Sequence, residues 1–463
     1  MIASTVATKT LDIALSRGGD FAEIFYEDRK DNSLLLRNNR IETVNSGRIH
    51  GAGIRVYVGL NAIYTYTNDT SPEGLYRCAK QASEAVVSQN RVVSQPLQLT
   101  KAPVIHTIQQ WPSQTEANKK AEVLRAANAS ARACGDAISQ VLCSYADTEQ
   151  EVHIYNSEGL CISDTRVYTR LSCLAVASNA TENQQAHSAP GAMMGFDFFS
   201  TRVDPVALGK DVATSAITML NAPSCPAGYM PVAIDNGFGG VIFHEACGHS
   251  LEATSVAFGN SEFCGKMGQP IASACVTAVD DGTIANEWGS TAIDDEGMPT
   301  TKLVLIENGI LKNYMIDKLN SKRMGMAPTG SGRRQSYAYA PTSRMRNTYI
   351  ASGTDARESI ISTMGDGLYA AKLGGGSVNP VTGEFNFAVD EGYLVKDGKI
   401  AHPVRGASLI GKGAEVLMRI DRVSSDMRMA QGMCGSLSGN VPVNVGQPMI
   451  RIAGMTVGGR MDA

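Results

Sequence analysis

The sequence predicts an α+β protein of two domains: an N-terminal α/β-mixed domain with helices on a sheet, and a C-terminal, mostly antiparallel β domain. Its 463 residues are too many for one ordinary hydrophobic core. With 43% hydrophobic and 19% charged residues, the chain can bury large cores. Residues 221–228 contain two prolines and a glycine, and they separate a helix-containing half from a glycine-rich, strand-rich half. We therefore expect domains at 1–222 and 223–463.

The first domain alternates helix and strand patterns. Residues 10–17 look like the end of a helix that stops at Gly18-Gly19. Further strands are expected at 21–27, 33–37, 53–58 and 62–67, and further helices at 73–87, 117–133 and 205–219. Residues 92–112 contain three prolines and little periodicity, which is typical of a linker. Such a linker would divide the domain into subdomains 1–90 and 113–222.

The second domain has turn signals that are typical of antiparallel sheet. Asn308-Gly309 and Asp397-Gly398 each predict a tight hairpin, because these residue pairs readily adopt positive φ. Residues 440–457 alternate again between apolar and polar side chains.

Composition argues against several classes of function. A net charge of -4 and a pI near 6.0 provide no positive surface for phosphate backbones, so direct nucleic-acid binding is not expected. The sequence shows neither a signal peptide nor a membrane-spanning apolar stretch. Its ten cysteines lack C-x-x-C spacing, which favours free thiols or a metal ligand in a cytoplasmic protein.

The segment His244-Glu245-Ala246-Cys247-Gly248-His249 carries the strongest chemical signal. In the H-E-x-x-H pattern of zinc peptidases, two histidines share a helix face and the glutamate acts as general base. Here the spacing is one residue longer, which on a regular α-helix separates the rings by about 140°. A single π-type turn, beside which Gly248 makes sense, would bring them together. Without that turn the histidines are ordinary packed or surface groups, and the spacing alone does not decide.

Further segments of the second domain are informative in combination. They are 223–228 (PSCPAG), 244–252 (HEACGHSLE), 288–290 (WGS), 294–297 (DDEG), 307–311 (ENGIL), 332–337 (GRRQSY), 433–435 (MCG), 443–448 (VNVGQP) and 458–459 (GG). Together they resemble the TldD/PmbA family, whose members are often labelled modulators of DNA gyrase. The first domain resembles the family more loosely, at 19–23 and 53–55. The resemblance implies zinc peptidase activity in the TldD branch, which has an H-E-x-x-x-H motif and a distant cysteine, whereas the partner branch lacks the motif.

Carried over residue by residue, the resemblance implies that His244, His249 and Cys434 bind Zn²⁺. Three protein ligands would leave a fourth position for water. Glu245 would accept a proton from that water and pass it to the leaving amine. Glu252, three residues after His249, is either an alternative ligand or an outer partner that orients a histidine.

Other residues carry weaker signals. Cys247 lies roughly on the face of His244, but the resemblance places no ligand there, and we expect it to serve packing. Arg333 and Arg334 could hold a peptide carboxylate, although adjacent arginines usually include a solvated one. Gly375 lies in a triple glycine without the phosphate-binding signature, so we expect a turn or a close backbone approach to substrate. The segment 294–297 lacks Ca²⁺-loop spacing and is expected to be a solvated turn.

These features favour a zinc-dependent peptidase that hydrolyses unfolded or short extended peptides, with water activated by Zn²⁺ and Glu245. The strand-rich domain favours a peptide substrate that binds as an added β-strand. The resemblance implies a homodimer, or a heterodimer with a PmbA-like paralogue, that encloses the site. The alternative is a non-catalytic peptide-binding or regulatory subunit with a structural or vestigial metal, which four protein ligands would indicate. Charge and motifs do not support a gyrase-directed regulator.

Overall fold

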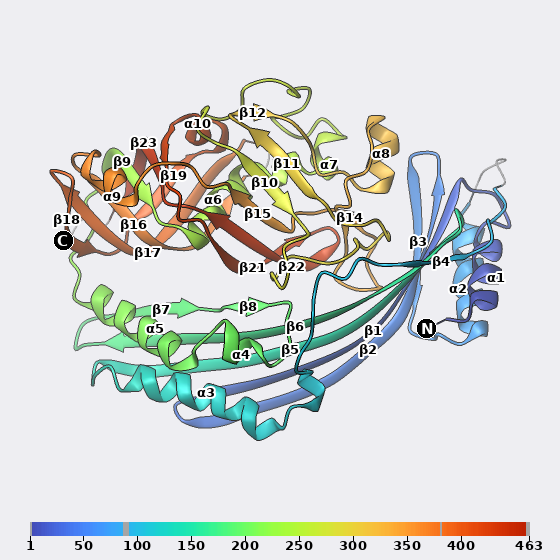
Figure 1. The fold of residues 1–463 in the computed structure, drawn as a ribbon, viewed down its shortest axis with the longest axis horizontal. Coiled ribbons are helices and arrows are strands. Elements are labelled where there is room, and N and C mark those ends of the chain that lie inside the picture. Colours follow the sequence, from blue (N-terminus) through green and yellow to red (C-terminus); the bar gives the residue numbers. More distant parts are fainter. Residues whose placement is uncertain (1, 87–91, 380–381, 460–463) are drawn as a thin grey trace.

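A computed structural model describes residues 2–86, 92–379 and 382–459, and it confirms the α+β class. In Figure 1 long, curved strands of the N-terminal half run beneath the C-terminal half, which is built from shorter strands and brief helices. The sheets of the C-terminal half are mostly antiparallel, as expected. None of the helices in these ranges has both the length and the apolar character needed to span a lipid bilayer.

One large sheet forms the N-terminal half. Its strands follow the order β3-β2-β1-β5-β6-β4, and β7 and β8 also pair with β6. The strands are β1 (Phe21–Arg37), β2 (Arg40–Val58), β3 (Asn61–Thr67), β4 (Gln98–Lys101), β5 (Ile138–Asn156), β6 (Leu160–Ser178), β7 (Asn183–Ser188) and β8 (Gly191–Ala192). Because β1 pairs with β5, segments 1–90 and 113–222 both supply strands to the same sheet.

Strand β1 is longer than the sequence predicted. It runs through both short strands expected at 21–27 and 33–37, because the polar residues between them keep pairing with β2 on one side and β5 on the other. A partly solvated stretch of strand can carry polar side chains without leaving the sheet. The polar run therefore marks a partly exposed part of one strand, and the expectation of two strands is wrong.

The helices of this half lie close to their predicted positions. They are α1 (Ser4–Ala14), α2 (Pro72–Glu84), the 3-10 turn η1 (Pro112–Gln114), α3 (Ala117–Arg132), α4 (Phe198–Thr201) and α5 (Pro205–Leu220). The start of α2 follows from Ser71, which accepts a hydrogen bond from the Gly74 amide, and from Pro72 in the first turn. Helix α1 ends at Ala14, before the predicted end at Arg17. Val87, the last residue of the predicted 73–87 helix, lies outside the described residues.

Alternation along β1 gives the sheet two different faces. Ala22 and Ile24 pack in a core under α1 and α2, and Leu34 and Leu36 pack in a second core under α3 and α5. In Figure 1 these helix pairs lie at the two ends of the sheet. Intervening residues such as Glu23 point the opposite way, toward the C-terminal half. That half therefore packs on the face that the helices leave uncovered.

The C-terminal half contains two larger sheets. One has the order β12-β11-β10-β15-β22-β21, and the other has the order β16-β9-β23-β19-β17-β18 with β20 beside β23. Because β16 pairs with both β9 and β17, five strands of the second sheet close into a ring. The strands are β9 (Gly228–Ile234), β10 (Ala278–Asp281), β11 (Lys302–Glu307), β12 (Ile310–Leu311), β13 (Gly332–Arg333), β14 (Thr342–Ser343), β15 (Asn347–Ile350), β16 (Gly367–Val378), β17 (Glu384–Lys396), β18 (Lys399–Val404), β19 (Ser408–Lys412), β20 (Ile420–Val423), β21 (Arg428–Ser436), β22 (Gly439–Gln447) and β23 (Ile450–Gly458).

Short helical segments lie between these sheets and around them. They are η2 (Gly237–Gly240), α6 (Val241–Phe243), η3 (His244–Gly248), η4 (His249–Leu251), α7 (Ala253–Val256), α8 (Lys318–Met324), α9 (Arg357–Ser362) and α10 (Gly413–Met418). The consecutive segments α6, η3 and η4 contribute Phe243, Ala246 and Leu251, in that order, to the largest hydrophobic core among the described residues. The packing of these side chains in the core fixes the position of the HEACGH segment.

Both predicted hairpins are confirmed. Asn308 and Gly309 connect β11 to β12, and Asp397 and Gly398 connect β17 to β18. All four residues have positive φ, as expected for tight hairpin turns.

A buried set of ion pairs joins the two halves. It consists of Glu23, Arg55, Arg166, Asp295, Glu296 and Arg334, which we call the interdomain ion network. Arg55 lies 2.7 Å from Glu23 and 2.8 Å from Glu296. Arg334 lies 2.7 Å from Glu23, and Arg166 lies 2.7 Å from Asp295. The expectation that 294–297 form a solvated turn is therefore wrong, because Asp295 and Glu296 are buried against Arg166 and Arg55 of the other half.

Candidate metal centre

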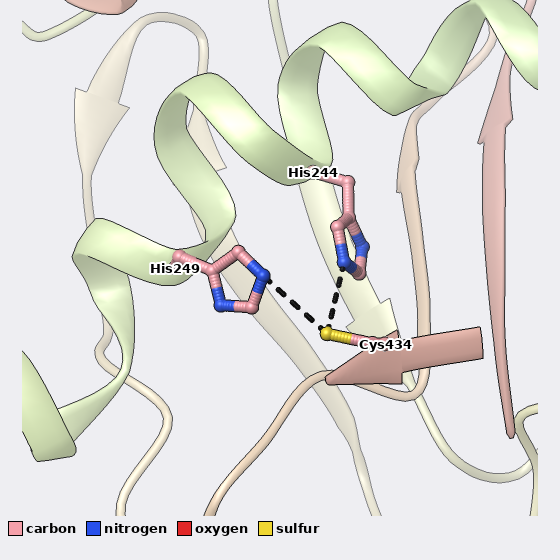
Figure 2. Close-up of side chains that lie close together, drawn as sticks. All are labelled: His244, His249 and Cys434. Carbon is pink, nitrogen blue, oxygen red and sulfur yellow. Dashed lines mark hydrogen bonds between the residues drawn. The ribbon is translucent and has the colours of Figure 1, made fainter. Parts of the chain in front are cut away.

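The helix that carries HEACGH is widened at its two histidines. Segment η3 is a π-helical turn, which confirms the distortion that the longer spacing required. The turn brings the ring centroids of His244 and His249 to 5.1 Å from each other. Figure 2 shows the imidazoles of His244, the first residue of η3, and His249, the first residue of η4, projecting toward Cys434 on β21.

Three potential ligand atoms converge at this point. Nε2 of His244 lies 3.4 Å from Sγ of Cys434, and Nε2 of His249 lies 3.3 Å from the same sulfur. Typical zinc–nitrogen and zinc–sulfur bonds at a tetrahedral ion would separate nitrogen from sulfur by about 3.6 Å. All three atoms lie within 4.8 Å of one another. The donor types and their spacing therefore fit one zinc ion, and we call these three residues the metal centre.

The electrostatics of the two imidazoles differ. Burial, with added repulsion from His249 and Arg344, lowers the pKa of His244 well below its ordinary value. Burial also opposes the charge on His249, but Glu252 and Cys434 outweigh it and raise the pKa of His249 well above its ordinary value. His244 is thus neutral with a free lone pair, and a bound cation would replace the proton that His249 holds.

Glu252 orients His249 from the side away from Cys434. One carboxylate oxygen of Glu252 lies 3.1 Å from Nδ1 of His249, so Nε2 faces the sulfur. The other oxygen accepts a hydrogen bond from the Met345 amide and lies 3.9 Å from Nε of Arg344. The same guanidinium donates a hydrogen bond to the backbone carbonyl of Cys434. Arg344, which no local sequence pattern indicated, therefore links the carboxylate to the strand that carries the thiol.

Glu245 lies beside the three ligand atoms without joining them. Its carboxylate is 3.9 Å from Nε2 of His249, and its side chain is 30% exposed. Burial raises its pKa, and the charge on His249 opposes that rise. A carboxylate with a raised pKa, next to the ligand atoms and reachable by solvent, is suited to accept and return a proton.

Gly248 is required by a close approach between two segments. A Cβ at this position would lie 2.2 Å from Sδ of Met345. Its φ of -54° is that of an ordinary helix, so the residue does not depend on the conformational freedom of glycine. Gly248 lies in the π turn, as expected, but glycine is needed there because Met345 packs against it.

The remaining residues named from the sequence lie in different environments. Cys247 is fully buried in the hydrophobic core, and burial raises the pKa of its thiol well above the ordinary value. Gly375, on β16, is exposed, and a Cβ at this position would meet no described atom within 4 Å. Arg334 belongs to the interdomain ion network. Arg333 donates hydrogen bonds to the carbonyls of Met345 and Pro442. Both arginines are buried, so the expectation that one of them is solvated is wrong.

Three family descriptions match consecutive parts of the chain. The PmbA/TldA metallopeptidase domain 1 matches residues 22–86, the central domain matches 111–220, and the C-terminal domain matches 227–459. The chain belongs to the TldD/PmbA family.

Relatives and solved structures agree with this assignment. The chain is 36% identical to a protein of Haemophilus influenzae called "Metalloprotease TldD homolog", over 98% of this chain and 97% of the relative. It is 32% identical to a "Metalloprotease" of Methanothermobacter thermautotrophicus, over 95% of this chain and 96% of the relative. The fold is similar to a Thermotoga maritima structure described as a candidate modulator of a DNA gyrase, with a TM-score of 0.81, 21% identity and coverage of 98% and 99% of the two chains. It is also similar to TldE of Thermococcus kodakarensis, with a TM-score of 0.77, 18% identity and coverage of 98% and 99%. The chain is therefore a member of a metallopeptidase family.

Proposed function

We propose that this protein is a zinc-dependent peptidase of the TldD type that hydrolyses unfolded or short extended peptides. The observation that carries the proposal is the convergence of two imidazole nitrogens and one thiol sulfur beside the carboxylate of Glu245. The names of the relatives support a metalloprotease. The mixed nitrogen and sulfur donor set supports zinc in preference to magnesium or calcium, which prefer oxygen ligands.

Each side chain has a role that follows from its position. His244, His249 and Cys434 would hold the ion, and Glu252 would fix the orientation of the His249 ring. Bound zinc would supply a Lewis acid that polarises a peptide carbonyl and makes water more acidic. Glu245 would accept the proton of the attacking water and deliver it to the leaving amine.

An open sheet edge supports binding of the peptide as an added strand. Strand β21, which carries Cys434, is the last strand of its sheet and pairs with β22 among the described strands. A groove of about 770 Å³ is lined by Arg428 to Gly432 of this strand and by Gly375 of β16. A peptide in this groove would pair with those backbone groups of β21 that Arg170, Trp288 and Arg344 do not contact, with little demand on the side chains of the peptide. The missing side chain at Gly375 leaves room for its backbone.

The alternative, a closed structural zinc site in a non-catalytic subunit, needs a fourth protein ligand. Glu252 was the sequence candidate for that ligand. Its carboxylate instead contacts Nδ1 of His249 and the Met345 amide. This arrangement supports an open fourth position and therefore a catalytic role. We further propose cytoplasmic assembly as a homodimer, or as a heterodimer with a PmbA-like paralogue, which light scattering on purified and co-expressed protein would test.

The test combines metal content with peptide hydrolysis. Wild-type protein is expected to contain about one zinc ion per chain and to cleave unstructured peptides while sparing folded proteins. Glu245→Gln should retain zinc but lose activity by about 10²–10⁴-fold, since general acid–base catalysis typically contributes that factor. Glu307→Gln is the matched control, because Glu307 is 53% exposed and lies at a hairpin in the same domain. Equal cleavage by wild type and Glu245→Gln would contradict the proposal.

A further inference from the structure

An arginine-rich cavity lies where β21 and β22 face the N-terminal sheet. Its volume is about 440 Å³. Six arginines line it: Arg29, Arg166, Arg170, Arg333, Arg334 and Arg346. Trp288 forms part of the wall, and its indole N–H donates a hydrogen bond to the carbonyl of Gly432 on β21. The cavity therefore borders the strand that carries the thiol of the metal centre.

Half of these arginines are neutralised by carboxylates. Arg29 lies 2.9 Å from Asp31, Arg166 lies 2.7 Å from Asp295, and Arg334 lies 2.7 Å from Glu23. These pairs account for the positive charge on three of the six side chains.

The guanidinium nitrogens of the other three arginines have no carboxylate oxygen within 4.0 Å among the described residues, although the backbone amide of Arg346 donates a hydrogen bond to Asp280. Arg170 donates hydrogen bonds to the carbonyls of Ala189 and Gln431, and it stacks on Trp288 with 5.2 Å between guanidinium carbon and ring centroid. Arg333 donates to two carbonyls, and Arg346 donates to a carbonyl and to a threonine hydroxyl. Arg333 and Arg346 are 4% and 2% exposed. Burial and the nearby Arg346 disfavour the charged form of Arg333 and lower its pKa, and a bound anion would stabilise that charge.

The position of the cavity connects it to the proposed substrate path. Met433 lines the cavity, and the next residue is Cys434. Successive side chains of a strand point to opposite faces, so the metal centre and the cavity lie on opposite faces of β21. Arg170 lines both the cavity and the groove along β21. A peptide paired with β21 would thus direct one residue toward the metal centre and a neighbouring residue toward the arginines.

We propose that the cavity at Arg170, Arg333 and Arg346 binds a carboxylate of the peptide substrate, next to the residue at the metal centre. The inference rests on the proposed peptidase function. Guanidinium groups bind carboxylates through short, charge-assisted hydrogen bonds, which are stronger when water is excluded. The carboxylate has two possible sources, the C-terminus of the peptide and the side chain of an acidic residue. Arg334, which the sequence also suggested for this task, is already neutralised by Glu23.

Binding is measured through Trp288, which lies in the cavity wall. The chain has two tryptophans, so a Trp111→Phe background leaves Trp288 as the reporter. The probes are three alanine pentapeptides with a blocked N-terminus. The first has a free C-terminal carboxylate, the second has a C-terminal amide, and the third has a C-terminal amide and a central glutamate. We expect at least one carboxylate peptide to bind about 10-fold tighter than the neutral amide, because a hydrogen bond to a charged group is strong. The peptide with the higher affinity identifies the source of the carboxylate.

Variants of the cavity arginines test whether the higher affinity for carboxylate peptides arises in the cavity. Arg170→Gln and Arg333→Gln are each expected to bring the ratio of affinities for the carboxylate and neutral peptides close to one, whatever their effect on the affinity for the neutral amide itself. Arg419→Gln, at a side chain that is 43% exposed and lies on a surface ion pair, is the control and should keep the full preference. If one cavity variant does not fold, the other variant and the three-peptide comparison in the background protein still decide.

The outcomes separate this inference from the proposed function. Equal affinity for charged and neutral peptides, or a preference that persists in the folded cavity variants, would overturn the carboxylate site whether or not the protein cleaves peptides. A carboxylate preference without hydrolysis by the zinc-loaded protein would overturn the peptidase function and leave the binding site standing. With both present, the preference should also appear in kcat/KM as a similar factor of about 10.

Discussion

The metal centre and the interdomain ion network both consist of polar side chains brought together from distant parts of the chain, but they differ in how completely these are paired. In the network, each arginine lies within 2.8 Å of a carboxylate and each side chain is at most 6% exposed. In the metal centre, two imidazole nitrogens and a sulfur face one another, and the neighbouring Glu245 is 30% exposed. The network is complete without a ligand, whereas the three atoms of the metal centre would gain their full set of contacts from the ion that we propose they bind.

This difference separates structure from chemistry in the same domain. Buried charges that neutralise one another fix the arrangement of two halves, and removing one partner is costly. Ligand atoms that converge on a point with solvent nearby leave a position for an ion and a reactant. Substitutions in the two regions should therefore affect different measurements.

Replacing a ligand of the metal centre should have the largest effect. We expect Cys434→Ser and His249→Ala to lose bound zinc and to reduce peptide hydrolysis by at least about 10²–10⁴-fold, since the general base then lacks an activated water. Thermal unfolding of the metal-free proteins should change little. Zinc analysis and circular dichroism on the same samples provide the check, and a variant that keeps zinc and activity would contradict the ligand assignment.

Removing one charge from the interdomain ion network should produce the opposite pattern. Glu23→Gln leaves Arg55 and Arg334 without their shared carboxylate, and breaking a buried pair in this way typically costs about 3–5 kcal/mol. Chemical denaturation should report this loss of stability, while the folded fraction binds zinc as before. Unchanged stability would mean that the network does not hold the two halves together.

Weakening the support of His249 should have an intermediate effect. Glu252→Gln keeps the shape of the side chain but removes its charge, and loss of such an outer partner typically lowers metal affinity by about 10–100-fold. Competition with a chelator measures the affinity directly. An unchanged affinity would show that His249 holds its orientation without the carboxylate.

Filling the contact beneath the π turn should have a smaller effect. Gly248→Ala places a methyl group against Met345, and such overpacking typically costs about 1–3 kcal/mol. We expect lower thermal stability and weaker zinc binding together, because the strain lies next to His249. The double variant Gly248→Ala with Met345→Ala should recover part of the loss, and no recovery would contradict the packing explanation.

Titration of Glu296 should have the smallest effect, a gradual change in the free energy of unfolding with pH. Burial raises its pKa to about 8, with Arg55 opposing that rise. The folded state then binds the proton more tightly than the unfolded chain, so this contribution to stability is present in acid and is lost as pH rises toward 8. Linkage limits the slope for one proton to about 1.4 kcal/mol per pH unit. Denaturation of wild type and Glu296→Gln between pH 5 and about 8 should show a shallower decline for the variant, and parallel curves would contradict the raised pKa.

Local patterns in the sequence were sufficient where the cause is local. Asn308-Gly309 and Asp397-Gly398 form their turns because of their own backbone preferences. The spacing of His244 and His249 indicated that a shared metal ion would need a π turn, which is present. Cys434 is different, because 185 residues separate it from His249 and only the resemblance pointed to it.

The interdomain ion network could not be predicted in the same way. Asp295 and Glu296 look like a solvated turn because their partners, Arg166 and Arg55, lie on strands of the other half. The continuous β1 was missed for a related reason, since its polar middle is held by neighbours that are distant in sequence. In both cases the deciding contacts are long-range, and a local pattern contains no information about them.

X-ray absorption of the zinc-loaded protein tests the central claim most directly. The metal centre predicts two nitrogen ligands at about 2.0–2.1 Å, one sulfur at about 2.3 Å and one further light atom from solvent. The sulfur signal should vanish in any residual zinc bound by Cys434→Ser. A wild-type spectrum without sulfur, or with four ligands all supplied by the protein, would contradict an open catalytic zinc site at these residues.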